Sequence, residues 1–257
     1  MTQPAAVDYY AQIKASTAAV AALVETGDLA MPIPTCPEWT LRELAIHIGR
    51  AHRWAAQITS TRSPDFIEFR SLPDGRFPDT PQERAAWLAA GAQRLVDAVD
   101  EAGQDRVWTF RGPFPASFWG RRMCHETLVH HADAMIAAGQ RPEFPAALAA
   151  DAIDEWLTDL MAPAGGEADI RAAALEPGCG LHVHATDDGL DGGEWLIRHG
   201  EDGVTVVRGH GKGDAAVAGP AADLLLVLLR RVPSDDPAVT VHGDPSVLER
   251  WLAGTPF

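Results

Sequence analysis

The sequence predicts a two-part protein, in which an antiparallel bundle of four long helices precedes a smaller domain of strands and helices. The chain has 257 residues, which exceeds a typical single domain. Apolar residues three and four apart, the helical period, dominate its first half. Strand-like runs separated by Gly- and Asp-rich turns occupy the second half. We therefore expect a helical domain over 1–162, an α/β domain over 172–257, and a linker within 162–178.

Helix-start signals place the bundle helices. Thr40 and Glu43 form the pattern of a capping box, in which the two residues satisfy each other's free backbone amides. Thr80 begins a similar pattern with proline at the first helical position. Gly27, Gly103 and Gly139 follow three of the periodic segments, as expected for helix ends. The expected helices cover 5–26, 40–58, 80–103, 117–139 and 144–161.

Two connections, 62–79 and 104–116, are long for a compact bundle and rich in Pro, Gly, Phe and Arg. Loops of this length are usually functional or disordered, and the aromatic content favours packed functional loops. In the second half, 181–185, 194–198 and 204–208 predict a three-stranded meander. The expected elements that follow are a buried helix over 219–231, a strand over 238–242 and a helix over 245–253.

Charge and composition exclude several function classes. The chain has 36 acidic and 21 basic residues and a net charge of −15, which argues against binding nucleic acid or an anionic membrane surface. No apolar stretch approaches the ~20 residues of a membrane span. The N-terminus lacks a secretion signal, and the three cysteines lack CxxC spacing, so we expect a cytoplasmic protein. Phosphate-loop, dinucleotide-binding and GxSxG hydrolase motifs are missing from the sequence.

Histidines on two of the expected helices suggest a metal site. Glu126 and His130 are four residues apart and share one helix face. His47 lies on the apolar stripe of the second helix, facing the core. Together the three side chains supply two imidazoles and one carboxylate, the ligand set of an open catalytic zinc site. Asp133 lies one turn beyond His130 and is expected to support a ligand.

Simpler interpretations remain open for each of these residues. A Glu/His pair four apart is often a solvated ion pair, and a single histidine on an apolar face is often a hydrogen-bonded core residue. His182 and His184 share one strand face, but no third ligand is evident near them, which favours a structural role. Cys36 precedes a helix, where the helix dipole can activate a thiol, although a packed small residue is the preferred interpretation. Cys124 points about 200° away from Glu126 on the same helix, which argues against a ligand.

Two motifs and the C-terminal run resemble a known family. CPEWTLRELAIHIGRAHRWA (36–55) resembles the N-terminal signature of the mycothiol-dependent maleylpyruvate isomerase family, a branch of the DinB-like metal-binding four-helix bundles. RRMCHETLVHHADA (121–134) resembles that family's second metal motif. The segment from GLHVHATD to VTVHGD (180–244) resembles its small α/β domain, so the resemblance spans nearly the whole chain.

The resemblance implies a divalent metal, usually zinc, held by His47, Glu126 and His130, with a further position open to water or to the thiol of mycothiol. In the family's reaction the thiolate adds to the cis double bond of maleylpyruvate, the carbon–carbon bond rotates, and elimination leaves fumarylpyruvate. Relatives in the wider superfamily resemble thiol S-transferases. Arg230 is the candidate for gripping a substrate carboxylate, because arginine binds carboxylates bidentately. A solvated helix end is the alternative for this residue.

We therefore expect a cytoplasmic enzyme, a monomer or homodimer, that uses a divalent metal and mycothiol for isomerisation or S-transfer on a small electrophile. Two alternatives stay open at this stage. One is a metal-assisted hydrolase of a thiol conjugate, and the other is a non-catalytic metal- or thiol-binding stress module.

Overall fold

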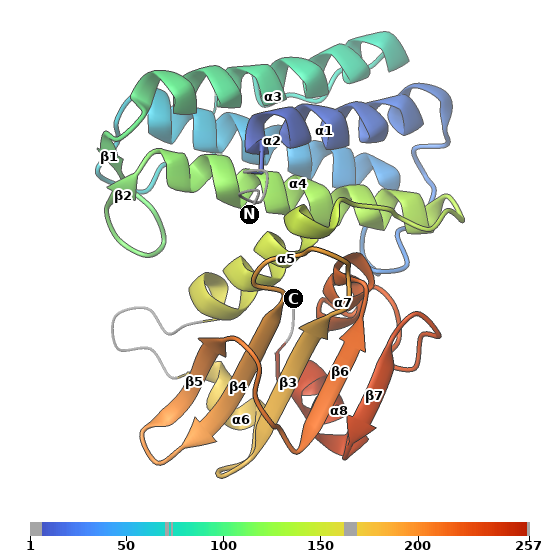
Figure 1. Cartoon of the computed structure of the whole chain (residues 1–257). Coiled ribbons are helices and arrows are strands. Elements are labelled where there is room, and N and C mark those ends of the chain that lie inside the picture. The colour runs from blue at the N-terminus through green and yellow to red at the C-terminus, as the bar shows by residue number, and fades with distance from the viewer. Residues whose placement is uncertain (1–6, 70–71, 73, 162–168, 256–257) are drawn as a thin grey trace. The chain divides into compact units, whose positions relative to one another are not determined.

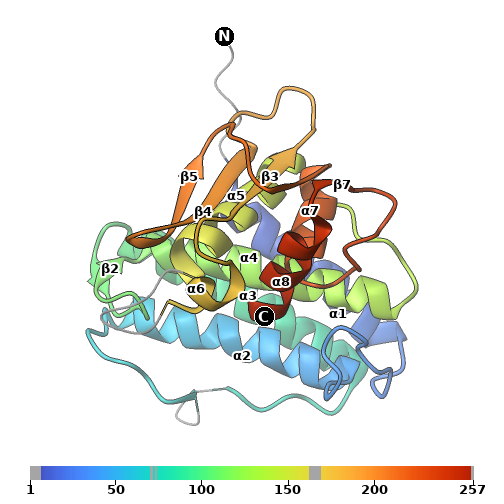
Figure 2. The same ribbon diagram turned by 90° about the horizontal axis from the view of Figure 1, so that it is seen from below.

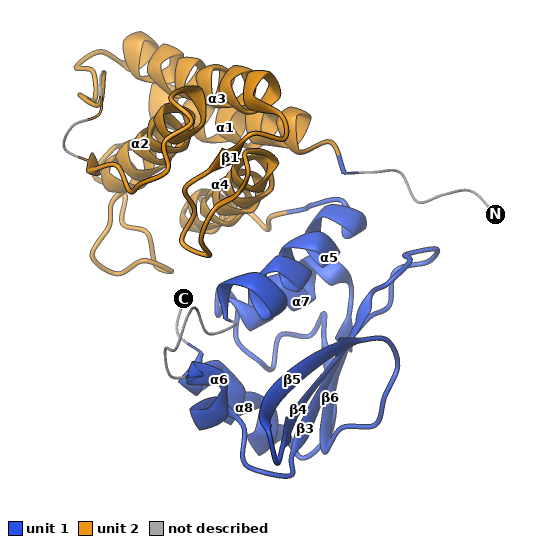
Figure 3. Ribbon diagram, turned by 90° about the vertical axis from the view of Figure 1, so that its left-hand side faces the viewer, with its two compact units in different colours: residues 1–7, 143–257 blue, residues 8–142 orange. Residues whose placement is uncertain are grey.

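The structure, a computed structural model, describes residues 7–69, 72, 74–161 and 169–255 and divides into two compact units (Figures 1 and 3). The helical unit covers Asp8–Pro142, and the second unit contains the described residues from Glu143 onward together with Val7. Among the described residues, no helix has the length and hydropathy needed to cross a membrane.

The helical unit is the predicted four-helix bundle (Figure 2). Both α1 and α2 pack chiefly against α3 and α4, so that α1 and α2 are diagonal partners in the bundle. This arrangement places α2 beside α4, which are far apart in the sequence. The four helices are α1 (Tyr9–Thr26), α2 (Leu41–Ser60), α3 (Pro81–Ala102) and α4 (Ser117–Ala137).

Both predicted helix starts are confirmed. The backbone N–H of Thr40 donates to Glu43 Oε2 at 3.1 Å, and the capping box at the start of α2 is complete. At the start of α3, the hydroxyl of Thr80 accepts from the backbone N–H of Glu83 at 3.4 Å. These contacts satisfy backbone donors that the first helical turn leaves free.

The close contact between α2 and α3 fixes how α2 is turned. A Cβ atom on Gly49 would lie 1.9 Å from the ring of Trp87, so only glycine permits this approach. The guanidinium of Arg53 lies 4.0 Å from the centre of the same ring, and its Nη2 donates to Trp87 O at 2.9 Å. Because this side of α2 faces α3, the other side, which carries His47, faces α4.

The two long connections pack through aromatic rings. The rings of Trp54 and Trp108 lie 5.7 Å apart, and those of Phe66 and Trp108 lie 5.3 Å apart. The second connection also contains two short paired strands that were not expected, β1 (Arg106–Val107) and β2 (Phe114–Pro115). The contacts show packed loops, while their expected functional role stays a prediction.

The second unit contains a five-stranded sheet in the order β5-β4-β3-β6-β7. The predicted antiparallel meander of β3, β4 and β5 is confirmed. β6 was not expected; it pairs parallel to β3 and antiparallel to β7. The strands are β3 (Gly180–Ala185), β4 (Glu194–Gly200), β5 (Gly203–Arg208), β6 (Ala215–Gly219) and β7 (Thr240–Gly243).

The helices of the second unit lie toward one face of its sheet, as Figure 1 shows with α6 and α8 behind the strands. Leu181 and Val183 point to this face and are fully buried. Because side chains alternate along a strand, His182 and His184 lie on the opposite face. The helices are α5 (Ala146–Glu155), which continues as a π-helical turn (Trp156–Leu160), α6 (Ile170–Ala174), α7 (Ala221–Leu228) and α8 (Pro245–Gly254).

The compact units differ from the expected domains over 1–162 and 172–257. The helix expected at 144–161 forms, but it belongs to the second unit, since α5 packs against α7 there. The division between the units therefore falls at Pro142 and Glu143. Of the expected linker at 162–178, residues 162–168 lie outside the described residues and Ile170–Ala174 form α6.

His52 is a fully enclosed histidine on the bundle side of α2. His52 is only 1% exposed, and its Nε2 lies 2.8 Å from the hydroxyl of Thr127 on α4. Burial, with a smaller contribution from the charge of Arg53, lowers the pKa of His52 to about 3. The folded protein therefore keeps this imidazole neutral at pH values where the unfolded chain protonates it.

We expect this histidine to destabilise the bundle in acid. Below the unfolded pKa of about 6.5, the free energy of unfolding falls by about 1.4 kcal/mol per pH unit until the folded pKa is reached. Urea unfolding should show wild type losing about 2–3 kcal/mol more than His52→Gln between pH 6.5 and 4.5, because glutamine keeps a partner for Thr127 without titrating. Equal losses in the two proteins would contradict this assignment.

Candidate metal centre

Three potential ligands from two helices converge at one point between α2 and α4. His47 Nε2 lies 2.8 Å from Glu126 Oε1, and His130 Nε2 lies 3.4 Å from the same oxygen. The three donor atoms all lie within 4.8 Å of one another. The structure thus brings together the three residues that the sequence singled out.

The two histidines differ in exposure. The side chain of His130 is 7% exposed, whereas that of His47 is 35% exposed. Its position on the apolar stripe predicted that His47 faces the core. The structure instead places His47 at the edge of the bundle. One side of the cluster is consequently accessible to solvent and to a small molecule.

Asp133 orients His130 from behind. Its Oδ2 lies 2.8 Å from His130 Nδ1, and the residue is fully buried. The hydroxyl of Thr35 donates to the other oxygen of Asp133 at 2.6 Å. Because Nδ1 is engaged in this way, the Nε2 of His130 is the nitrogen left to face Glu126.

Cys36 lies closer to this cluster than the sequence indicated. Its thiol donates to Asp133 Oδ2 at 3.7 Å, whereas the sequence favoured a packed small residue. Cys36, His130 and Asp133 thus form a second possible ligand group that shares His130 with the first. Sequence spacing could not reveal this contact, because Cys36 precedes α2 and Asp133 lies on α4. Cys124 is buried in α4, and Cys179 belongs to the second unit.

Arg122 was not anticipated, although its spacing gave a signal. It lies four residues before Glu126 on α4, and its Nη2 donates to Glu126 Oε2 at 2.7 Å. Its side chain is only 6% exposed. The guanidinium therefore holds one carboxylate oxygen of Glu126, and the other oxygen faces the two histidines.

The electrostatics of the cluster favour a cation. Burial acts to raise the pKa of Glu126, but hydrogen bonds from His130 and His47 and the charge of Arg122 hold it well below the usual value. Burial also opposes protonation of His130, yet the contacts with Asp133 and Glu126 prevail and raise its pKa to about 9. The fully buried carboxylate of Asp133 and the partly buried carboxylate of Glu126 thus stabilise positive charge at the position of His130.

Trp39 is a second residue that sequence reasoning missed. Its ring centre lies 4.8 Å from that of His47 and 5.4 Å from that of His130. The indole thus packs against both imidazoles and limits the directions in which they can turn. Its place inside the motif at 36–55 was the only signal available.

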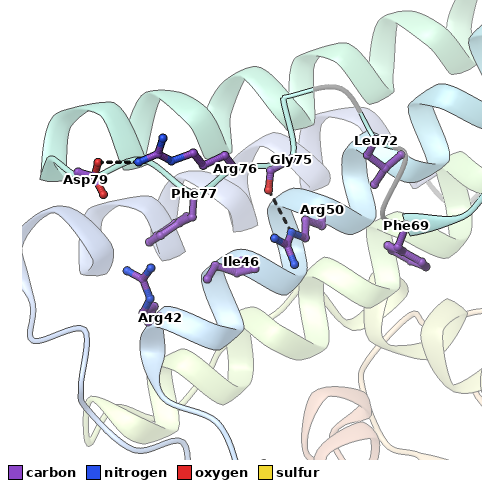
Figure 4. Close-up of a pocket in the computed structure, with 9 residues that line it drawn as sticks. All are labelled: Arg42, Ile46, Arg50, Phe69, Leu72, Gly75, Arg76, Phe77 and Asp79. Carbon is purple, nitrogen blue, oxygen red and sulfur yellow. Dashed lines mark hydrogen bonds and ion pairs between the residues drawn. The ribbon is translucent and has the colours of Figure 1, made fainter.

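A cavity of about 630 Å³ also lies along α2, as Figure 4 shows. Arg42, Ile46 and Arg50 of α2 line one side, with Arg76 and Phe77 opposite. Arg50 Nε donates to Gly75 O at 3.1 Å, and Arg76 pairs with Asp79 at 3.2 Å. None of the three candidate ligands lines this cavity, so it is a separate feature of the bundle.

Arg230 lies in the second unit, just after α7. It is exposed, and its backbone adopts the left-handed conformation with φ of 58°. The N–H groups of Arg230 and Arg231 donate to the carbonyls of Val227 and Leu226, which forms a Schellman motif. Glycine usually occupies this position, so an arginine here is unusual. Its expected contact with a substrate carboxylate stays a prediction.

The donor set fits a zinc-type ion. Two imidazole nitrogens and one carboxylate oxygen suit zinc and its neighbours in the first transition row, while magnesium and calcium prefer oxygen alone. Asp133 supplies the outer partner that a ligating histidine usually has. Three protein ligands leave a further coordination position for an exogenous group.

Comparisons with known proteins identify the family of the chain. Residues 10–135 match the profile of the mycothiol maleylpyruvate isomerase N-terminal domain, and 147–250 match that of the MDMPI C-terminal domain. A comparison with curated proteins gives no match.

Solved structures give the same fold. A crystal structure of the mycothiol-dependent maleylpyruvate isomerase is 16% identical, with a TM-score of 0.54, and 91% of each chain is covered. The crystal structure of a mutant of that enzyme is 17% identical, with a TM-score of 0.56 and the same coverage.

Metal content provides a direct test of the cluster. We expect wild type to retain one divalent ion at this site and His130→Ala to lose it, because a single carboxylate and imidazole hold zinc weakly. Asp133→Asn should reduce the affinity for zinc by about 10–100-fold, since it disturbs the support of His130 without removing a ligand.

Competition of each variant with a chromophoric zinc chelator measures these affinities. Cys36→Ala separates the two overlapping ligand groups. Unchanged affinity in this variant is expected for a site at His47, Glu126 and His130, whereas a loss as large as that of His130→Ala would assign the metal to Cys36, His130 and Asp133.

Proposed function

Because this chain belongs to the mycothiol maleylpyruvate isomerase family, we propose that it is an enzyme that uses mycothiol and a divalent metal ion to isomerise a small electrophilic cis-alkene. The observation that supports this most directly is the meeting of His47, Glu126 and His130 at one partly open point. Transfer of the thiol to an electrophile is the related reaction, since both begin with the same attack by sulfur.

Within this proposal, His47 and His130 would hold the ion through nitrogen and Glu126 would hold it through oxygen. A divalent ion in this position lowers the pKa of a thiol that it binds, and so makes a strong nucleophile available at neutral pH. The solvent-exposed side of His47 is where the thiol and the electrophile have access.

The surrounding residues keep the donors in place. Asp133 accepts from His130 Nδ1, which leaves the lone pair on Nε2 for the ion. Arg122 fixes Glu126 by its Oε2, so that Oε1 is the oxygen presented to the histidines. Trp39 packs against both imidazoles and restricts water on that side. The carboxylate–histidine contacts therefore position the donors before substrate arrives.

The reaction then follows from thiol chemistry. The sulfur adds to one carbon of the double bond, and the electron pair moves onto the conjugated carbonyl. The bond between the two former alkene carbons is now single and rotates. The electron pair returns, the double bond re-forms in the trans arrangement, and the thiol leaves unchanged. The nucleophile is external, because the thiol of Cys36 is directed to Asp133.

Activity measurements test this proposal. We expect purified holoprotein to isomerise maleylpyruvate, the family's substrate, only when mycothiol is added, and to lose this activity on chelation and regain it with zinc. Cys36→Ala should retain most of the activity, as the protein's own cysteines do not react. Turnover without a thiol would favour the hydrolase alternative, and thiol binding without turnover of any electrophile would favour a binding module.

Arg230→Gly separates the fold of α7 from the proposed role of its arginine. Relief of the left-handed conformation should stabilise the second unit by about 1 kcal/mol, measured by urea unfolding. If Arg230 grips a substrate carboxylate, KM for a dianionic substrate should rise by about tenfold or more. A stabilised variant with unchanged KM would show that the arginine only ends the helix.

A further inference from the structure

A second cluster of metal-binding residue types lies in the other unit, on the sheet face opposite α6 and α8. His182 of β3, Glu194 of β4 and His210, in the connection between β5 and β6, have donor atoms within 4.8 Å of one another. Glu194 Oε2 lies 2.9 Å from His182 Nε2 and 2.8 Å from His210 Nδ1. The pairing register explains the convergence: Glu194 lies opposite His184, one step along the same face from His182.

The structure gives His182 two partners that the sequence did not suggest, Glu194 and His210. His184 stacks on His182 with ring centres 5.7 Å apart, while Glu194 comes from β4 and His210 from the connection after β5. The ring of His210 meets that of His182 edge-on at 5.2 Å. The structural interpretation of His182 and His184 rested on the lack of a third ligand. The fold supplies further potential ligands, Glu194 and His210.

The buried nitrogen of His182 distinguishes this cluster from a simple ion pair. His182 is 5% exposed, and its Nε2 makes no hydrogen bond to any described residue. It lies 2.9 Å from Glu194 Oε2, within ion-pair distance but without the geometry of a hydrogen bond, whereas His210 Nδ1 makes a hydrogen bond with the same oxygen. A buried polar atom without a hydrogen bond is costly and requires an explanation. A bound ion supplies one, because it takes the lone pair of the nitrogen.

We propose that His182, Glu194 and His210 form a second binding site for a zinc-type transition-metal ion. Two imidazoles and one carboxylate are the same donor set as in the bundle, and they favour zinc over magnesium or calcium. The side chain of Glu194 is 28% exposed and that of His210 is 80% exposed, so an ion can enter from solvent. Once bound, the ion ties the connection at 209–214 to β3 and β4. This site is independent of the function proposed for the bundle.

Zinc titration of the full chain tests the site. In the double variant His47→Ala/His130→Ala, which removes two of the three bundle ligands, we expect one zinc ion to bind per chain. Adding His210→Ala should weaken that binding by more than about 100-fold, since even loss of an outer partner costs 10–100-fold. His242→Ala is the matched control, because His242 is exposed on β7, two strands away from β3 in the sheet. It should leave the affinity unchanged.

Single variants of the wild-type chain give an independent count. Wild type should bind two zinc ions, and His210→Ala should bind one; because His210 is exposed, we expect circular dichroism to show an unaltered fold. Cobalt substitution should give a visible d–d spectrum from each site, of which His210→Ala removes one. The proposal is overturned if the double variant binds no zinc, or if His210→Ala binds as much zinc as His242→Ala.

Discussion

The arrangement of the bundle around its candidate centre depends on one partly buried carboxylate, that of Glu126. A charge removed from water must be compensated by nearby donors, or the group loses its charge. Arg122 supplies one contact from the same helix, while His47 and His130 approach the other oxygen. Because His47 belongs to α2, this compensation also joins two helices. The same interactions that stabilise the carboxylate create a position that favours a cation.

Asp133 adds a further carboxylate, which contacts His130 on the side away from Glu126. It is fully buried, and it is satisfied by Thr35, Cys36 and His130. A ring nitrogen held by a carboxylate leaves the opposite nitrogen free to bind an ion, which is the usual support of a ligating histidine. Since Thr35 and Cys36 precede α2 and Asp133 lies on α4, the support also crosses between the segments. The arrangement of the candidate ligands is thus maintained by the packing contacts of the bundle.

The second unit repeats the donor chemistry on a different scaffold. Along β3, alternate side chains are buried against the helices, and the others, His182 and His184, lie on the opposite face of the sheet. In the bundle, the shared face arises from residues four apart on one helix. In the sheet, it arises from the pairing of neighbouring strands and from a connection that folds back, bringing Glu194 and His210 to His182. The two scaffolds reach the same set of two imidazoles and one carboxylate by different periodicities.

The sequence by itself determined the helices of the bundle, the meander and the capping box at Thr40, because these depend on local periodicity and on contacts between near neighbours. It also identified Glu126 and His130 as residues of one helix face, for the same reason. The tertiary structure decided what lies beside them: the contacts of His47 and Cys36 require α2 and its preceding turn to pack against α4. It likewise decided the partners of His182 and the place of α5, since strand pairing and helix packing join residues whose separation along the chain carries no local signal.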